Sequence, residues 1–141
     1  MLHNWYPASA EKILGDLWLA NPLTVSLMKA TYSPAPDTHK VWADISSHEL
    51  PTAGGYTAGG VLLTAKAAPY NAAQDRTDLQ AADVTWGPGA TFDARYAVIY
   101  DASLAKPLWS LIDFEAVKSV SNGVFTIDFA AIGALAILPA P

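Results

Sequence analysis

The sequence contains no cysteine and few charged residues, and these two absences exclude several kinds of protein. Without cysteine there is no disulfide framework, thiolate catalysis, cysteine-bound zinc or iron–sulfur cluster. Charged residues make up 15% of the 141 residues, against about 25% in an average soluble domain. The formal net charge is −5, which argues against nucleic-acid binding, because that task needs a basic surface to displace counterions.

No hydrophobic run reaches the roughly 20 residues that a membrane-spanning helix needs. The most apolar stretch, residues 129–141, contains a glycine and ends in Pro-Ala-Pro, so we expect a final buried strand there. Residues 1–7 have neither the basic start nor the apolar segment of a signal peptide. We therefore expect no membrane partner, and the lack of cysteine fits synthesis in a reducing cytoplasm.

Apolar and aromatic side chains are abundant, at 52% and 11% of the residues. At this length we expect a single β-rich domain over residues 1–141 with a sizeable core, in which residues 1–7 could form an N-terminal arm. A surface that is poor in charge and rich in aromatic residues is typical of the buried centre of an interface. We therefore favour assembly with other chains over a monomer with an uncharged polar surface.

The residue pattern predicts a mainly β fold with a short N-terminal helix. The helix is expected from Ala8 to Leu14, with Gly15 as its C-cap and with Ile13 and Leu14 facing the core. Residues 23–29 alternate between apolar and polar, which predicts a half-buried strand. Further strands are expected at residues 61–67, 76–79, 84–86, 94–100, 107–114, 123–129 and 134–138. Such turn-separated short strands favour an antiparallel β-sandwich or a small barrel.

Three segments between the strands are expected to be turns or loops. Residues 38–44 predict one helical turn with Trp42 pointing inward. Residues 52–60 are glycine-rich but lack the Gly-Lys-Ser/Thr ending of a phosphate loop, so a flexible hairpin or an entry into a strand is expected. Residues 121–123, Ser-Asn-Gly, are the strongest turn signal and predict a turn that begins the strand at 123–129.

A metal site is conceivable at His39, Asp44 and His48, because imidazole and carboxylate groups suit zinc or iron. Their spacing matches no known ligand motif, and solvated surface histidines are the simpler interpretation. We therefore predict that the protein binds no metal.

The sequence also contains no motif that indicates a catalytic site. Asp75, Asp78 and Asp83 lie close in sequence, but they lack the alternating ligands and central glycine of a calcium loop, so we expect them to form turns. Nothing selects a pair of carboxylates for glycoside cleavage, and no Gly-x-Ser-x-Gly elbow occurs. We predict that the protein is not an enzyme and needs no cofactor.

A series of short motifs covers residues 8–130 in a distinctive order. They are Ile13-Leu-Gly, Leu17-x-Leu, Leu23-Thr-Val-Ser-Leu-Met, Tyr32-Ser-Pro with Asp37-Thr-His, Ile45-Ser-Ser-His-Glu-Leu, Gly55-Tyr-Thr-Ala-Gly-Gly, Ala82-Asp-Val-Thr-Trp, Ala94-Arg-Tyr-Ala-Val-Ile-Tyr, Leu111-Ile-Asp-Phe and Ser121-Asn-Gly-Val-Phe-Thr-Ile. Their order and spacing resemble a family of small virion structural proteins of tailed bacteriophages. The sequence departs from the family's pattern at residues 21–24, where the family tends to show Asp-Thr-Ile-Lys, and in its proline-rich C-terminus.

The resemblance implies a structural role and brings no catalytic residues. We expect a capsid decoration or cement protein that binds the outer shell and stabilises it by contact alone. A neck, tail or fibre-adaptor protein is the alternative, and a carbohydrate-binding β-sandwich module is the second alternative. The expected partners are the major capsid protein or other virion proteins, together with further copies of the chain, for which a trimer is the common geometry.

The aromatic residues of the N-terminal segment are candidate interface residues. Trp5 and Tyr6 precede the first expected helix, and termini without contacts are usually polar and disordered. Either Trp5 fills one end of the chain's own sandwich, or it anchors the segment on a partner, because buried aromatic side chains dominate interface energetics.

Overall fold

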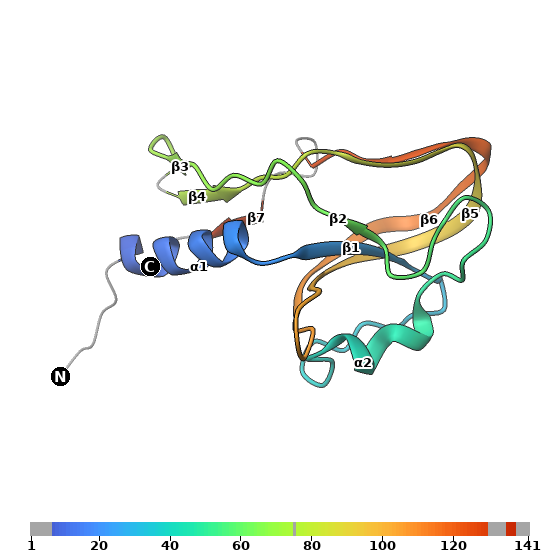
Figure 1. Ribbon diagram of the computed structural model, residues 1–141, viewed down its shortest axis with the longest axis horizontal. Coiled ribbons are helices and arrows are strands. Elements are labelled where there is room, and N and C mark those ends of the chain that lie inside the picture. The colour runs from blue at the N-terminus through green and yellow to red at the C-terminus, as the bar shows by residue number, and fades with distance from the viewer. Residues whose placement is uncertain (1–6, 75, 130–134, 138–141) are drawn as a thin grey trace. The chain divides into compact units, whose positions relative to one another are not determined.

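The structure is a computed structural model that describes residues 7–74, 76–129 and 135–137, with the backbone alone for residues 7–11 and 135–137 (Figure 1). The described part is mainly β structure with antiparallel sheets, which confirms the predicted fold class. The finer prediction of a sandwich or a small barrel stays a prediction.

The described elements include four short strands, then the two long strands β5 and β6, and a final short strand. They are α1 (Pro7–Ala20), β1 (Leu23–Met28), α2 (Trp42–Ile45), the 3-10 turn η1 (Ser46–His48), β2 (Val61–Leu62), β3 (Tyr70–Asn71), β4 (Arg76–Leu79), β5 (Val84–Asp101), β6 (Leu108–Ile127) and β7 (Leu135–Ile137). They group into two compact units. Unit 1 holds α1, β3, β4 and β7, and unit 2 holds the other elements. Whether the chain folds as the one domain expected from its length stays a prediction.

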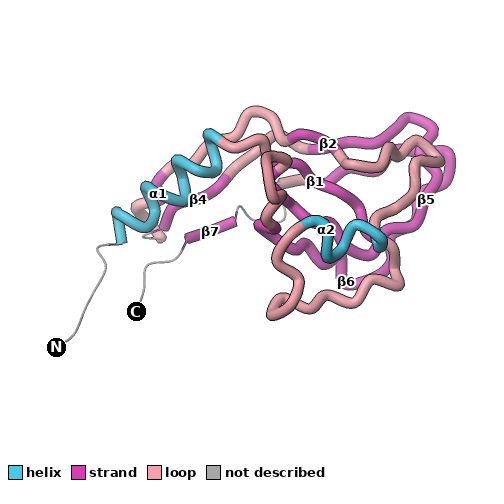
Figure 2. The backbone as a smooth tube through the Cα atoms, turned by 60° about the horizontal axis from the view of Figure 1, so that its bottom comes forward, coloured by secondary structure: helices cyan, strands magenta, loops and turns pink. Residues whose placement is uncertain are grey.

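Unit 2 is built on a four-stranded antiparallel sheet in the order β2-β1-β5-β6 (Figure 1, Figure 2). Strand β1 pairs with the C-terminal part of β5, from Leu23 opposite Asp101 to Met28 opposite Tyr96. All six residues of β1 are buried, including the polar Thr24 and Ser26. The prediction that this strand is half-buried is therefore wrong, because both of its faces are covered.

Strands β5 and β6 form a long hairpin where the sequence predicted four shorter strands. They pair from Val84 opposite Ile127 to Tyr100 opposite Leu108, and the register shifts at several irregular positions. Residues 121–123 lie inside β6 at one of these shifts, so the predicted turn there is wrong. Asn122 has a φ of 47°. Because asparagine and glycine adopt positive φ angles at low cost, an Asn-Gly pair suits a β-bulge as well as a turn.

Unit 1 contains α1 and the three-stranded antiparallel sheet β3-β4-β7. The helix continues through Gly15 to Ala20, so the predicted end at Leu14 is wrong. A side chain on Gly15 would place its Cβ 3.3 Å from the Cβ of Ala68. The glycine therefore permits close packing of the helix and does not act as a cap.

The side of α1 that is buried also differs from the prediction. Ile13 and Leu14 are 53% and 38% exposed, whereas Trp18 is 1% exposed. The Trp18 indole Nε1 donates a hydrogen bond of 2.9 Å to the carbonyl oxygen of Gln80. The tryptophan takes the buried position because it supplies the largest apolar surface on the helix while its N–H still finds an acceptor.

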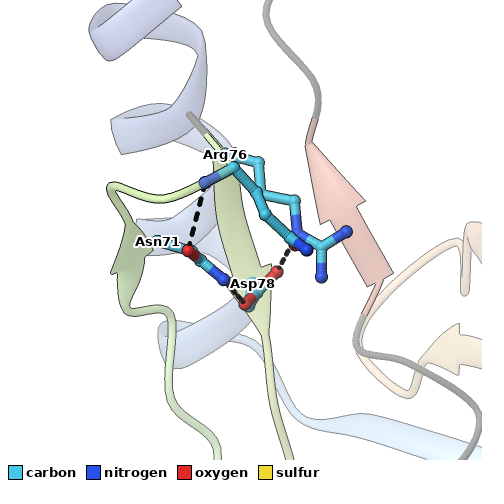
Figure 3. A network of polar contacts seen from close by, with 4 residues as sticks. Asn71, Arg76 and Asp78 are labelled. Carbon is cyan, nitrogen blue, oxygen red and sulfur yellow. Dashed lines mark hydrogen bonds and ion pairs between the residues drawn. The ribbon is translucent and has the colours of Figure 1, made fainter.

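Two acidic residues of unit 1, Asp78 and Asp83, have specific partners, and Figure 3 shows those of Asp78. Asp78 is buried within β4, accepts a hydrogen bond from Asn71 Nδ2 at 3.3 Å and forms an ion pair with Arg76 at 2.7 Å. Asp83 accepts a hydrogen bond from the backbone N–H of Phe129. The predicted turn role of Asp78 is therefore wrong, because the Arg76 and Asn71 side chains let a carboxylate be buried in a strand. Asp75 lies outside the described residues.

Candidate functional site

A pocket of about 320 Å³ opens in unit 2 and is the candidate functional site. It is lined by Tyr32, Pro34, Ala35, Pro36, His39, Lys40, Val98, Leu108, Trp109, Ser110 and Leu111. These residues come from the loop after β1, from β5 and from the beginning of β6. The loop is attached to β6 by a hydrogen bond of 3.0 Å from the Leu108 N–H to the Lys40 carbonyl oxygen.

The loop on one side of the pocket is held by its own backbone. The N–H groups of Thr38 and His39 both donate to the carbonyl oxygen of Ala35, at 3.0 and 2.8 Å. Prolines at positions 34 and 36 fix two further φ angles. We infer that this side of the pocket is ordered before any ligand arrives.

Asp44, the third residue of α2, closes the loop by bonding back to the residues that precede the helix. Its Oδ2 atom accepts hydrogen bonds from the N–H groups of Lys40, at 2.9 Å, and of Val41, at 3.0 Å. These two bonds hold the pKa of the Asp44 carboxyl below its usual value. The side chain therefore caps the helix, which is a structural role.

Tyr32 lies between the two histidines of this region. Its hydroxyl is 3.1 Å from His39 Nδ1, and its ring stacks on His39 at 5.7 Å and packs against His48 at 5.3 Å. Both histidines are half-buried, so they are partly exposed to solvent while one side of each ring packs against Tyr32. Within the described residues no three His, Asp or Glu side chains are grouped closely enough to hold a metal ion. The prediction that no metal binds stays a prediction.

The polar groups of the pocket are mainly hydrogen-bond donors. His39 Nδ1 accepts a hydrogen bond of 3.2 Å from the Ala35 N–H, so in the neutral ring the proton is on Nε2. The Lys40 ammonium donates to the Pro36 carbonyl oxygen at 3.0 Å. No carboxylate among the described residues forms an ion pair with Lys40. The pocket can therefore bind a ligand that has an apolar body and an acceptor group.

Of the pocket's polar residues, His39 was predicted from the sequence as a candidate ligand, whereas Lys40 and Trp109 were not. A lysine and a tryptophan that are far apart in the sequence share no motif that could indicate a common site. The predicted interface residues Trp5 and Tyr6 lie outside the described residues, so their role stays a prediction.

A buried polar network lies beside the glycine-rich loop, residues 52–60. The Tyr56 hydroxyl donates to Glu49 Oε1 at 2.7 Å and accepts from the Leu27 N–H at 3.1 Å. The Gly59 N–H donates to the same glutamate oxygen at 2.7 Å, and the Tyr100 hydroxyl donates to the Gly59 carbonyl oxygen at 2.8 Å. The loop is therefore bonded to the sheet and leads directly into β2, which begins at Val61. Of the two expectations for this segment, the entry into a strand is confirmed and the flexible hairpin is wrong.

Alkaline pH is expected to destabilise unit 2 through these tyrosines. Burial raises the pKa of Tyr56 and Tyr100 above the usual value of 10. Above pH 10 the unfolded chain therefore loses more protons than the folded chain, so the free energy of unfolding falls as the pH rises. Urea unfolding at a series of pH values should show this fall, and Tyr56→Phe should make it shallower. A slope that is unchanged in Tyr56→Phe would contradict this prediction.

Comparisons with protein-family models, with curated proteins and with solved structures find no match for this chain. The resemblance to phage virion proteins therefore stays a prediction from the sequence. Neither described helix has the length and hydrophobicity needed to cross a membrane.

Proposed function

We propose that the chain is a structural protein of a bacteriophage particle that acts by binding, and that its place is the outside of the capsid shell as a decoration or cement protein. Its partners are then the major capsid protein or other virion proteins and further copies of the chain, with a trimer as the proposed oligomer. The sequence resemblance and the low content of charged residues support this proposal.

The main support for the proposal is the exposed apolar surface of β6, the strand at one end of the unit 2 sheet. The strand is 20 residues long and is paired with β5 on one side. Leu111, Val117 and Val124 on this strand are 40%, 47% and 57% exposed. A long outer strand that exposes large apolar side chains is a surface on which another chain can bind.

The irregular centre of β6 limits which chains can pair with it. Lys118 lies opposite Ala94 and Asp113 lies opposite Tyr96, so four residues of β6 bulge where β5 has one. Glu115 within this bulge has a φ of 64°. Bulges and charges on outer strands oppose indiscriminate sheet extension, which suits a protein that must bind at defined positions on a symmetric shell.

The proposal is tested by adding the purified protein to shells that lack it. Because each bound copy adds its binding free energy to the shell, we expect saturable binding and a higher melting temperature of the shell. The control is a double variant, Val117→Asp with Val124→Asp, whose changes lie on exposed positions and should weaken binding without unfolding the protein. Failure of the wild-type protein to bind shells would contradict a decoration role.

A neck, tail or fibre-adaptor position is the remaining alternative within the particle. It differs in copy number, because a shell offers on the order of hundreds of equivalent positions and a neck or tail ring about a dozen. Binding to isolated tails or necks with no binding to shells would favour this alternative.

A further inference from the structure

We propose that the pocket of unit 2 binds an acidic peptide segment of a partner protein, in which a large apolar side chain is followed by a carboxylate. This inference rests on the proposed function and deepens it, because it names the chemistry of the partner. Three observations support it: the apolar lining of the pocket, its exposed lysine and its ordered loop.

The lining of the pocket is suited to an apolar group. Eight of its eleven residues are apolar or aromatic, and these include Trp109, Val98 and Leu111. The volume of about 320 Å³ is at the lower end of the range for ligand pockets, roughly 300–1,000 Å³. A single large side chain is therefore a better match for the cavity than an extended ligand.

The donors of the pocket favour an anion next to that side chain. The ammonium of Lys40 is exposed, and among the described residues it bonds to the Pro36 carbonyl oxygen and to no carboxylate. The Nε2–H group of His39 is a second donor, because its Nδ1 already accepts from the backbone. Because the chain as a whole carries a net charge of −5, the attraction for an acidic residue comes from this local cation and not from the overall charge.

The ordered loop lowers the cost of binding. Its backbone bonds to Ala35 and its two prolines already hold one wall of the pocket in place. Little conformational entropy is then lost when the ligand binds. A saccharide is a weaker match, because its many hydroxyl groups would face a lining that is mostly apolar, and the Tyr32 hydroxyl already bonds to His39 Nδ1.

The test is a titration of the full chain with matched peptides, followed by nuclear magnetic resonance of the Trp109 indole N–H. The probe is acetyl-Gly-Phe-Asp-Gly-amide, and its controls carry Asn in place of Asp or Ala in place of Phe. We expect saturable shifts with the probe and about threefold weaker binding of the Asn peptide, as for a solvent-exposed ion pair. The Ala peptide should bind about 30-fold more weakly, as for the loss of an anchoring side chain.

Two variants assign the effect to the pocket. Lys40→Gln should bind the Asp and Asn peptides equally, and Trp109→Ala should bind the probe about 30-fold more weakly. Lys118→Gln, which removes an exposed lysine of β6 outside the pocket, should behave as wild type. Should Trp109→Ala not fold, the comparison of Lys40→Gln with Lys118→Gln still decides the question.

In the titration, three outcomes would overturn the inference: no saturable shift with the probe, equal binding of the Asp and Asn peptides to the wild type, or binding of cellobiose at the same residues without binding of the probe. Shell binding by the same variants separates this inference from the proposed function. If Lys40→Gln and Trp109→Ala bind shells as the wild type does, the inference is overturned and the proposed function stands. If the wild type binds no shells, the proposed function is overturned.

Discussion

Gly60→Ala is expected to destabilise the protein by about 3 kcal/mol or more. Gly60 has a φ of 75°, a conformation that L side chains rarely adopt. A Cβ at this position would overlap the carbonyl oxygen of Val25 and the hydroxyl of Ser26. Val25 cannot move aside at low cost, because it pairs with Val61 on one side and with Ile99 on the other.

Gly59→Ala is the matched control for this change. Gly59 also has a positive φ, of 100°, but a Cβ at this position would meet no atom within 4 Å. Backbone strain alone should cost about 1 kcal/mol. The difference between the two variants in urea unfolding then measures the close approach of the loop to β1. Equal destabilisation by the two variants would show that the loop does not lie against Val25.

Tyr56→Phe is expected to lower the free energy of unfolding by about 2–3 kcal/mol. The change removes the acceptor of the Leu27 N–H, which is buried in β1, and the donor to Glu49. Tyr56 is 1% exposed, so water cannot readily replace its hydroxyl. A buried N–H without an acceptor costs more than the net value of the hydrogen bond itself.

Tyr100→Phe provides the comparison for Tyr56→Phe. Tyr100 donates one hydrogen bond, to the carbonyl oxygen of Gly59, so its loss leaves a single carbonyl group without a partner. We expect a cost of about 1 kcal/mol. Thermal unfolding followed by circular dichroism should rank Tyr56→Phe as clearly the more damaging change. The reverse order would contradict the assignment of Tyr56 as the centre of the network.

Strand positions could be predicted from the sequence where the pattern is local. The alternation in residues 23–29 predicted β1 to within one residue, and the residues of β4 were predicted at 76–79 as the structure has them. The burial of Ser26 on the polar side of β1 could not be predicted, because it depends on the loop that ends at Gly60, which is far from Ser26 in the sequence and lies against it in the fold. An alternation of apolar and polar residues indicates that one face of a strand is buried. When the polar face is buried as well, the alternation stays the same, so the sequence carries no sign of the second buried face.

Glycine roles were predicted less well than strands, because one residue type serves several structural purposes. Gly15 resembled a helix cap but packs against Ala68, and Gly123 resembled the end of a turn but lies in a bulge of β6.

The pocket could not be predicted from the sequence at all. It forms because Leu108 bonds to Lys40, which brings Trp109 beside the loop after β1, and this pairing is set by the tertiary fold alone.

The central claim, that this chain is a structural component bound to the outside of a phage shell, is tested most directly by counting its copies in the purified particle. Mass measurement of intact particles, together with quantification of this chain against the major capsid protein, gives that number. A decoration protein should be present in a fixed ratio to the capsid protein, on the order of hundreds of copies per particle. Absence of the chain from purified particles would contradict the account, and about a dozen copies would move it to the neck or tail.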